Sequence, residues 1–457
     1  MSELVHKGVE VIRGDPKAAI RKQSLPLILT FVLMMGFSVA DSIWVSGLGT
    51  SQLAALGFIS PLFFIITGLG NGLGAGVSSS IARFIGAEDK RSADNAAMHG
   101  ILLGFVVSLI LTILLLVFIK PIILFIGAGS VYQYAFDYAV IVFSASFTFI
   151  LSFIGVGVLR GEGDVNRASL AMISVFILNM VIDPIFIYTF KLGIGGAAIA
   201  TVLSTFLGFL IVYYWLIIKK DTYLSISFHN FVFDWSILKD ILNVSLPACS
   251  EEFIMQGVGI ILNYMLIIVS GAFAVAVFTA GWRLISFAII PALGIASAAL
   301  TVGGVAFGER DIGKLSTVYS YSLKLTVGAT LIIMVLTYVF APQISSLFAY
   351  SSSSLSIQEP LTQFLRACVL YFIIPIGIVA SFMFQAVGKG YISLLITLIR
   401  ECVLVIIVAY VCSILLGWGE VGVWYGMIYG CIFGSLIAYG AFKYYLKRIG
   451  KDFSGHV

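Results

Sequence analysis

The stretch that decides the fold reads SLPLILTFVLMMGFSVADSIWVS, from Ser24 to Ser46. It is long enough to cross a bilayer, which requires about 20 apolar residues. One carboxylate, Asp41, interrupts it near its far end. A charged side chain inside a bilayer costs several kcal/mol, so it persists only where it pairs, binds a proton or cation, or faces water. The polar residues at the depth of Asp41 in other spans are therefore the ones to identify.

The same apolar composition runs through the whole chain. Its 457 residues are 60% hydrophobic and 11% charged, whereas soluble proteins are about 25% charged. These proportions predict an all-α polytopic membrane protein. The net charge of +4 gives no reason to expect a nucleic acid partner. The alternating glycines from Gly68 to Gly76 lie inside a span with no strand before them, which favours close helix packing over a phosphate loop.

Twelve spans are expected, and the basic residues predict their orientation. The spans lie near 22–46, 52–80, 96–119, 131–158, 168–190, 195–218, 241–268, 272–303, 315–340, 362–387, 391–416 and 421–446. Twenty of the 26 basic residues fall in the terminal segments or beside alternate connections, and the other connections contain only Lys120 and Lys191. Because cytoplasmic loops are enriched in Lys and Arg, we expect a multi-pass protein of the cell membrane with both termini cytoplasmic.

The two halves of the chain repeat each other. Ser-Leu-Pro at 24–26 returns at 245–247, and the glycine pair at 193 and 196 returns at 419 and 422. Because each half has an even number of spans, six, both halves begin on the same side of the membrane. We therefore expect twelve transmembrane helices in two six-helix lobes, related by a pseudo-two-fold axis along the membrane normal. The predicted domains are a cytoplasmic N-terminal segment 1–21, an N-terminal lobe 22–218, a cytoplasmic linker 219–240, a C-terminal lobe 241–446 and a cytoplasmic tail 447–457.

Several polar side chains of the N-terminal lobe share the depth of Asp41. A helix rises about 1.5 Å per residue, so Asp41 lies roughly 24 Å from the inner edge of the bilayer core. Asn179 and Asp183 are four residues apart and therefore lie on one helix face. By the same count, the residues in the outer layer with Asp41 are Asp137, Tyr138, Asp183 and Thr201.

This layer predicts a cation site. Oxygen ligands suit a hard cation such as Na⁺, and buried carboxyls can hold protons instead, because burial favours the neutral form. A static hydrogen-bonded cluster is the alternative, although two acids without a nearby base would repel each other. The candidate residues of this cation site are Asp41, Asn179, Asp183 and Thr201, with Ser38, Asp137 and Tyr138 as further site or cavity residues. No organic cofactor is expected, and the cation would be H⁺ or Na⁺.

The second lobe lacks this cluster. Its positions equivalent to Asp41 and Asp183 are Leu262 and Ala409. Its charged residues can form a structural ion-pair network or contribute to gating and the cavity; the candidates are Glu251, Glu252, Arg283, Arg400 and Glu401. Pro26 and Gly36 are candidate points at which the first span bends.

Three motifs give the chain a family resemblance. They are LRGEGD at 159–164, ARFIGAED at 82–89 and GIGGAAIAT at 193–201. With the six-plus-six arrangement, the chain resembles the multidrug and toxic compound extrusion (MATE) family, in particular its DinF-like prokaryotic branch.

The resemblance implies an antiporter and not an enzyme. It implies export of small amphipathic, often cationic, organic compounds against inward-moving H⁺ or Na⁺ by alternating access, carried out by a monomer in the lipid bilayer. The branch's coupling residues match Asp41 on the first span, Asn179 and Asp183 on the fifth and Thr201 on the sixth. The second-lobe cation site of the NorM-like branch requires an Asp on span ten, which this sequence does not contain at 362–387.

Two other transporter classes agree less well with the sequence. A lipid-linked precursor flippase of the same superfamily would have a strongly cationic cavity, and the predicted N-lobe spans contain no buried basic residue. A major-facilitator antiporter would carry a Gly-x-x-x-Asp-Arg-x-Gly-Arg loop after span two. Residues 83–95 contain Gly86, Asp89 and Arg91 without the second Gly-Arg pair.

Overall fold

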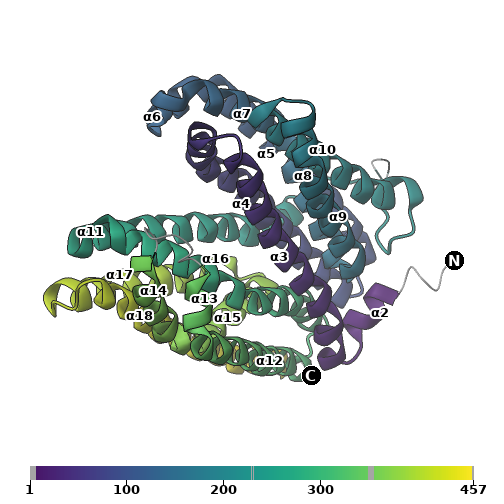
Figure 1. Cartoon of the computed structure of the whole chain (residues 1–457). Coiled ribbons are helices and arrows are strands. Elements are labelled where there is room, and N and C mark those ends of the chain that lie inside the picture. Colours follow the sequence, from purple (N-terminus) through teal and green to yellow (C-terminus); the bar gives the residue numbers. More distant parts are fainter. Residues whose placement is uncertain (1–6, 228, 230, 348–354, 455–457) are drawn as a thin grey trace. The chain divides into compact units, whose positions relative to one another are not determined.

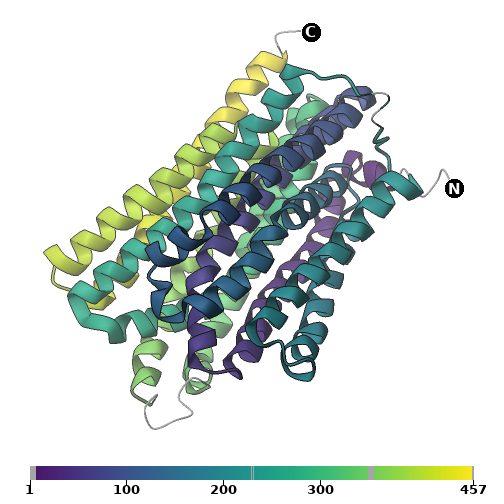
Figure 2. The same cartoon turned by 90° about the horizontal axis from the view of Figure 1, so that it is seen from above.

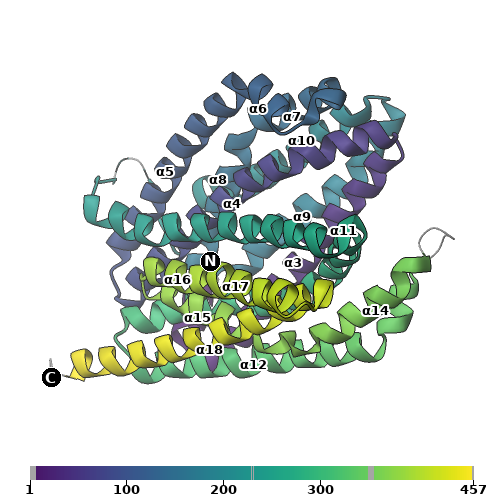
Figure 3. The same cartoon turned by 90° about the vertical axis from the view of Figure 1, so that its left-hand side faces the viewer.

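The structure is a computed structural model that describes residues 7–227, 229, 231–347 and 355–454. Within these residues every regular element is a helix, as Figure 1 and the two rotated views in Figure 2 and Figure 3 show. The elements up to the linker are α2 (Lys7–Arg13), α3 (Pro16–Ser46), α4 (Thr50–Gly86), α5 (Lys90–Val117), α6 (Ile119–Phe125), η1 (Ala128–Val131), α7 (Tyr132–Ser144), α8 (Ser146–Gly161), α9 (Val165–Pro184), η2 (Ile185–Thr189), α10 (Gly193–Tyr213) and η3 (Tyr214–Lys219).

The second half begins with one very long helix. Its elements are α11 (Trp235–Gly308), α12 (Ile312–Val339), α13 (Ala341–Ser346), η4 (Leu355–Ile357), α14 (Gln358–Ala367), η5 (Cys368–Ile373), α15 (Pro375–Ala386), α16 (Gly390–Thr397), η6 (Leu398–Leu404), α17 (Val405–Tyr410), η7 (Val411–Leu415) and α18 (Gly419–Ser454). Of the short elements, η2, η3, η6 and η7 are π-helices that prolong the helices before them.

The helices account for twelve spans. In the described part of the chain, nine helices are long and apolar enough to cross a membrane, and two bent pairs raise the number to eleven. The 74 residues of α11 would extend about 110 Å as one helix, several times the ~30 Å bilayer core. Gly271 interrupts α11 with φ 76° and ψ −171°, so this element comprises two spans. The predicted fold class is therefore confirmed.

Contacts divide the chain into two units that are described separately. Unit 1 comprises Met1–Asp15 and Leu29–Cys249, and unit 2 comprises Pro16–Ile28 and Ser250–Val457. The divisions fall inside α3, two residues after Pro26, and inside α11. The predicted linker 219–240 lies wholly within unit 1.

Glycine allows α4 and α8 of unit 1 to pack closely. A Cβ atom added to Gly157 of α8 would lie 2.4 Å from the carbonyl oxygen of Gly74 and 2.8 Å from its Cα atom. Real Cβ atoms essentially never approach other atoms within 3.0 Å, so neither position accepts a side chain without separating the helices. The expected packing role of the Gly68–Gly76 stretch is therefore confirmed.

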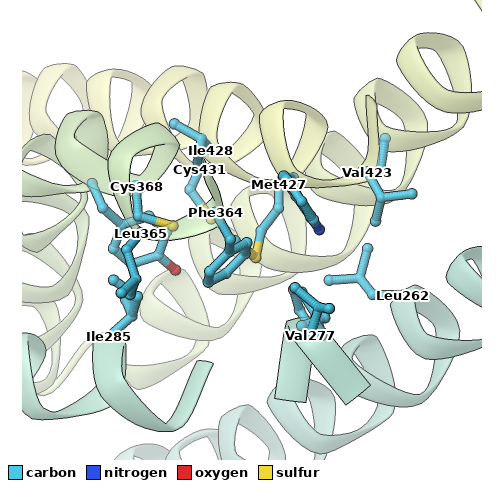
Figure 4. Packing of buried hydrophobic residues seen from close by; sticks show 14 of the residues in the cluster. Leu262, Val277, Ile285, Phe364, Leu365, Cys368, Val423, Met427, Ile428 and Cys431 are labelled. Carbon is cyan, nitrogen blue, oxygen red and sulfur yellow. The ribbon is translucent and has the colours of Figure 1, made fainter. Parts of the chain in front are cut away.

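Unit 2 has its own aromatic and aliphatic core. The ring of Phe364 makes edge contacts with Phe278 and Trp424, at centroid distances of 5.7 and 5.3 Å. Figure 4 shows Phe364 together with Cys368, Met427 and Cys431, which belong to the same buried cluster. All five cysteines are free thiols.

The linker forms a strap across one end of unit 1. We use this name for residues 221–227 and 231–234. Asn95 Nδ2 donates to the Val232 carbonyl at 2.6 Å, and the Ser225 N–H donates to Asp94 Oδ1 at 2.8 Å. Five hydrogen bonds with four side chains, Asp94, Asn95 and His99 of α5 and Glu162 of the α8–α9 turn, thus hold a segment that the sequence alone indicates only as a polar connection.

His99 fastens the strap through both ring nitrogens. Its Nδ1 lies 2.9 Å from the Asn95 carbonyl oxygen, and the Asp234 N–H donates to its Nε2 at 3.0 Å. Only a neutral ring with the proton on Nδ1 satisfies both contacts. The ring is also flanked by Phe231 and Phe233, at 4.9 and 5.4 Å. His99 therefore has a structural role, which the sequence did not indicate.

Glu162 lies beneath the strap, in the turn after α8. Its side chain is buried, and the Leu224 N–H donates to Oε2 at 3.1 Å. Burial raises the pKa of this carboxyl to about 8, outweighing the hydrogen bond from Leu224. The same turn contacts α2, because a Cβ at Gly8 would lie 3.0 Å from the Glu162 carbonyl oxygen.

We expect Glu162→Gln to make the strap insensitive to pH. A carboxyl whose pKa is raised by folding stabilises the native state below its ordinary pKa and loses that contribution as pH rises through about 8. The amide hydrogens of residues 221–227 should therefore exchange faster at pH 8.5 in the wild-type protein than in the Glu162→Gln variant. The difference should be at least about tenfold, since one pKa unit is worth ~1.4 kcal/mol. The test compares the amide exchange rates of the two proteins after correction for the pH dependence of intrinsic amide exchange. Glu10→Gln, an exposed carboxyl, is the control, and equal wild-type and Glu162→Gln rates at pH 8.5 would contradict the expectation.

Candidate functional site

Five side chains in unit 1 form a polar cluster: Asp41, Tyr138, Asn179, Asp183 and Thr201. Asn179 Nδ2 donates to Asp183 Oδ1 at 3.3 Å and to Thr201 Oγ1 at 3.2 Å. The Tyr138 hydroxyl is hydrogen-bonded to the Thr201 side chain and interacts with the charges of Asp41 and Asp183. Asn179, Asp183, Thr201 and Tyr138 are all less than 5% exposed. The cluster therefore joins residues from α3, α7, α9 and α10.

Three oxygen atoms of this cluster have no hydrogen-bond partner. They are Asp41 Oδ1, Asn179 Oδ1 and Asp183 Oδ2, all buried. The charges of the two carboxylates interact with each other, and neither makes an ion pair within the described residues. An unsatisfied buried polar atom costs ~1–3 kcal/mol, so three together indicate a partner that protein atoms do not supply.

The helices around the cluster hold it through aromatic contacts. Phe37 of α3 stacks on Phe176 of α9 at 5.6 Å, and the Tyr188 hydroxyl of η2 donates to the Trp44 carbonyl at 2.5 Å. Pro184 ends α9 directly after Asp183 and has no N–H to donate to the carbonyl four residues earlier. The chain continues as the π-helix η2, which places Tyr188 against α3. Asp41 and Asp183 are thus positioned by contacts on both sides.

A cation or protons fit these atoms. Two carboxylates, an amide oxygen and a hydroxyl form an all-oxygen set of the kind a hard cation prefers, and either carboxylate can take up a proton instead. No set of three or more His, Cys, Asp or Glu side chains suited to a metal ion occurs among the residues that the structure describes. The residues that would supply oxygen ligands to Na⁺ in this cluster are Asp41, Asn179, Asp183 and Thr201.

Two residues predicted near this layer lie apart from the cluster. Asp137 accepts a hydrogen bond from Gln133 Nε2 at 2.8 Å. It lines a separate cavity of about 440 Å³ with Gln52, Tyr134 and Lys191. Ser38 is exposed, and no contact joins it to Asp41 or Asp183. Adjacent residues point about 100° apart on a helix, which explains why Tyr138 joins the cluster and Asp137 does not.

The charged residues predicted for gating or the cavity in unit 2 lie in smaller groups. Arg400 Nε lies 2.9 Å from Glu401 Oε1, and the Cys431 thiol lies 3.4 Å from Glu401 Oε2. Gln385 Nε2 donates to Glu251 Oε2 at 3.3 Å. Two of the predicted residues, Glu252 and Arg283, are exposed and have no ion pair among the described residues. Among the five candidate residues, Arg400 and Glu401 make the one ion pair found in the described part of the chain.

The two residues at which the first span is expected to bend lie in different surroundings. Pro26 lies within α3, beside the division between the two units. A Cβ atom at Gly36 would meet nothing within 4 Å, so this glycine is not required for close packing.

One prediction about the N-terminal lobe is wrong. The sequence indicated no buried basic residue in its spans, but Arg160 lies in the last turn of α8 and its Nε is buried without a hydrogen-bond partner. Its Nη2 reaches to 3.7 Å from the Cβ position of Gly74. The reason is that α8 continues to Gly161, beyond the predicted span end at 158, and helical side chains point back toward the N-terminus.

Twelve apolar spans and a buried acidic cluster define a multi-pass membrane transporter of small molecules. A family model described as MatE matches residues 26–185 and 247–411. The chain therefore belongs to the MATE family, whose members are transporters and not enzymes.

Similar proteins cover nearly the whole chain. A crystal structure of MATE in complex with MaL6 has a TM-score of 0.95 at 40% identity and covers 97% of this chain and 99% of its own. A MOP superfamily transporter from Pyrococcus furiosus, described as having a binding pocket of reverse polarity that suggests a different function, has a TM-score of 0.94 at 40% identity, with coverage of 97% and 99%. The FAD transporter of Shewanella oneidensis is 30% identical over 334 residues, 71% of this chain and 73% of that protein. The multidrug export protein MepA of Staphylococcus aureus is 25% identical over 86% of each chain.

Proposed function

We propose that the protein is an antiporter that exports small amphipathic organic compounds in exchange for H⁺ or Na⁺ bound at Asp41 and Asp183. The observation that carries the proposal is the set of three unpartnered buried oxygens, Asp41 Oδ1, Asn179 Oδ1 and Asp183 Oδ2. Two buried carboxylates without a basic partner are repulsive when both are charged. Binding a proton or Na⁺ removes that repulsion, so the cluster takes up a cation whenever it is closed off from water.

Coupling requires that the cation binds one conformation better than the other, because equal binding to both shifts no equilibrium. The element placed to respond is α3, which carries Asp41 and contacts α9 through Phe37 and η2 through Trp44. Cation binding at the cluster either draws Asp41 closer to Asp183 or frees Asp41 to move away from it. Either change alters the contact of α3 with α9, with Pro26 and Gly36 as the points where α3 can bend.

We expect imposed gradients to identify the coupling ion. The purified protein is reconstituted into sealed vesicles that contain a cationic dye. A pH gradient and a Na⁺ gradient are then imposed in separate experiments. Export driven by Na⁺ at fixed pH, and lost in Asp183→Asn, establishes Na⁺ coupling. Export driven by a pH gradient in Na⁺-free buffer establishes H⁺ coupling. The control variant is Asp137→Asn, whose carboxylate lies outside the cluster and should keep wild-type export.

A second candidate function is the movement of an anionic compound, such as a lipid-linked precursor. Arg160 favours it, because a guanidinium with a buried, unpartnered Nε is suited to an anionic group. Two relatives point the same way, one named an FAD transporter and one described as having a pocket of reverse polarity. In the vesicles above, failure of both gradients to drive dye export would favour this second function.

A further inference from the structure

Unit 1 carries a lateral groove between α9 and α10 that contains none of the cluster residues. Its volume is about 470 Å³, within the roughly 300–1,000 Å³ of ligand pockets. Its only aliphatic hydroxyl, Ser174 Oγ, already donates to the Leu170 carbonyl at 2.8 Å. The wall is therefore mainly apolar, and its residues are Leu170, Ser174, Leu207, Leu210, Ile211, Tyr214 and Trp215.

The groove is open along its side. Leu170, Leu210 and Tyr214 are 54%, 44% and 48% exposed. These residues belong to membrane-spanning helices, where the surrounding solvent is lipid. The π-helix η3 begins at Tyr214, so both Tyr214 and Trp215 line the same end of the groove. Tyr and Trp are enriched at the level of lipid headgroups, which places this end at a membrane surface.

Basic residues continue the line of the groove at this end. Arg167 precedes Leu170 by one helical turn, and its guanidinium lies 5.8 Å from the centroid of the Trp215 ring. Lys219 ends η3, and Lys220 follows it in the left-handed conformation with φ 50°. The apolar groove therefore passes directly into a cationic region.

The acids of this region are already engaged. Asp221 pairs with Arg167 at 2.9 Å and with Lys219 at 2.8 Å, and Asp164 pairs with Arg167 at 3.4 Å. Lys220 is exposed and makes no ion pair with any residue that the structure describes. The three basic residues Arg167, Lys219 and Lys220 exceed the two paired acids by one positive charge. A third acid, Glu162, interacts with Arg167 but is buried beneath the strap.

We propose that the groove binds one acyl chain of an anionic glycerophospholipid, whose phosphate is held by Lys220. The apolar wall recognises the chain, the Tyr214 and Trp215 rings lie at the glycerol level, and the excess positive charge recognises the phosphate. The proposal is independent of the transported substrate and of the coupling ion.

Trp215 provides the direct test. In a variant whose other five tryptophans are Phe, fluorescence quenching by phospholipids with dibrominated chains reports chain occupancy at the groove. We expect phosphatidylglycerol to bind at Trp215 roughly fivefold more tightly than phosphatidylcholine, since a basic residue near a membrane surface favours anionic lipid by ~1 kcal/mol. Lys220→Gln should bring the ratio close to one. A variant that retains only Trp418, in unit 2 beside Gly417 and Gly419, should show a ratio near one.

A second measurement keeps all tryptophans. Native mass spectrometry of the wild-type protein with phosphatidylglycerol should show a tightly bound lipid that is lost in Lys220→Gln and in Ser174→Trp, which fills the groove. Lys120→Gln removes an exposed charge at a distant position and should retain the lipid. Equal quenching by both lipids at Trp215, or an unchanged bound lipid in Ser174→Trp, would overturn the proposal and indicate bulk lipid only.

Discussion

Asp41→Asn is expected to abolish transport, by about 100-fold or more, while the protein still folds and inserts. Asparagine has the shape of aspartate but can neither take up a proton nor supply a negative charge to Na⁺. The remaining Asp183 would then have no second carboxylate to repel, so cation binding would no longer change the interaction between α3 and α9. Drug export from vesicles and growth protection in cells measure the effect.

The stability of the same variant separates coupling from packing. Asp41 Oδ1 is buried without a hydrogen-bond partner, so replacing the carboxylate by a neutral amide should leave the melting temperature equal or higher. A residue needed only for packing would lower it. Asp137→Asn, in which the carboxylate is hydrogen-bonded to Gln133 outside the cluster, is the matched control and should transport normally. Undiminished export by Asp41→Asn would rule out the proposed coupling site.

Gly157→Val is expected to have the largest effect on stability. The new Cβ would lie 2.4 Å from the Gly74 carbonyl oxygen and 2.8 Å from its Cα atom, and both are backbone atoms that cannot rotate away. Helix association in membranes depends on close van der Waals packing at small residues. Overpacking costs ~1–3 kcal/mol and occasionally more, so we expect a loss of ~3 kcal/mol. For a chain of 457 residues, whose unfolding entropy is ~2.1 cal/mol/K per residue, this corresponds to a fall of roughly 3 °C in melting temperature.

Gly57→Val is the matched control, because Gly57 lies on α4 and a Cβ there would meet nothing within 4 Å. Its melting temperature should change by no more than about 1 °C. Thermal unfolding of the detergent-solubilised protein, followed by size-exclusion chromatography, compares the two. Equal losses in both variants would show that helix propensity, rather than the contact of α4 with α8, sets the effect.

The buried acids were predictable because depth follows from residue counting. A rise of about 1.5 Å per residue placed Asp41, Asp183 and Thr201 in one layer, and the structure brings Asp183 and Thr201 together through Asn179. Counting could not separate Asp137 from Tyr138. Which of two adjacent residues faces a cluster depends on the rotation of the helix, and packing against neighbours decides that rotation.

The strap and Arg160 could not be predicted for a related reason. The polar sequence of 221–234 indicates an exposed connection, yet Asn95, His99 and Glu162 bind its backbone. Arg160 lies at the predicted edge of a span, where a shift of one turn decides whether a side chain faces water or protein. Neither case has a local signal, because both depend on contacts between residues far apart in the chain.

The sequence alone determined the class of this protein: twelve apolar spans in two repeated halves, with costly acids in one half only. Hydrophobic length and charge are local properties, and a bilayer selects for them directly. Only the tertiary structure decided which atoms of Asp41, Asn179 and Asp183 are left without partners. It also decided that Gly74 and Gly157 meet, and that Leu170 of α9 and Trp215 of η3 line one groove. These features arise from the rotation and approach of whole helices, which packing sets.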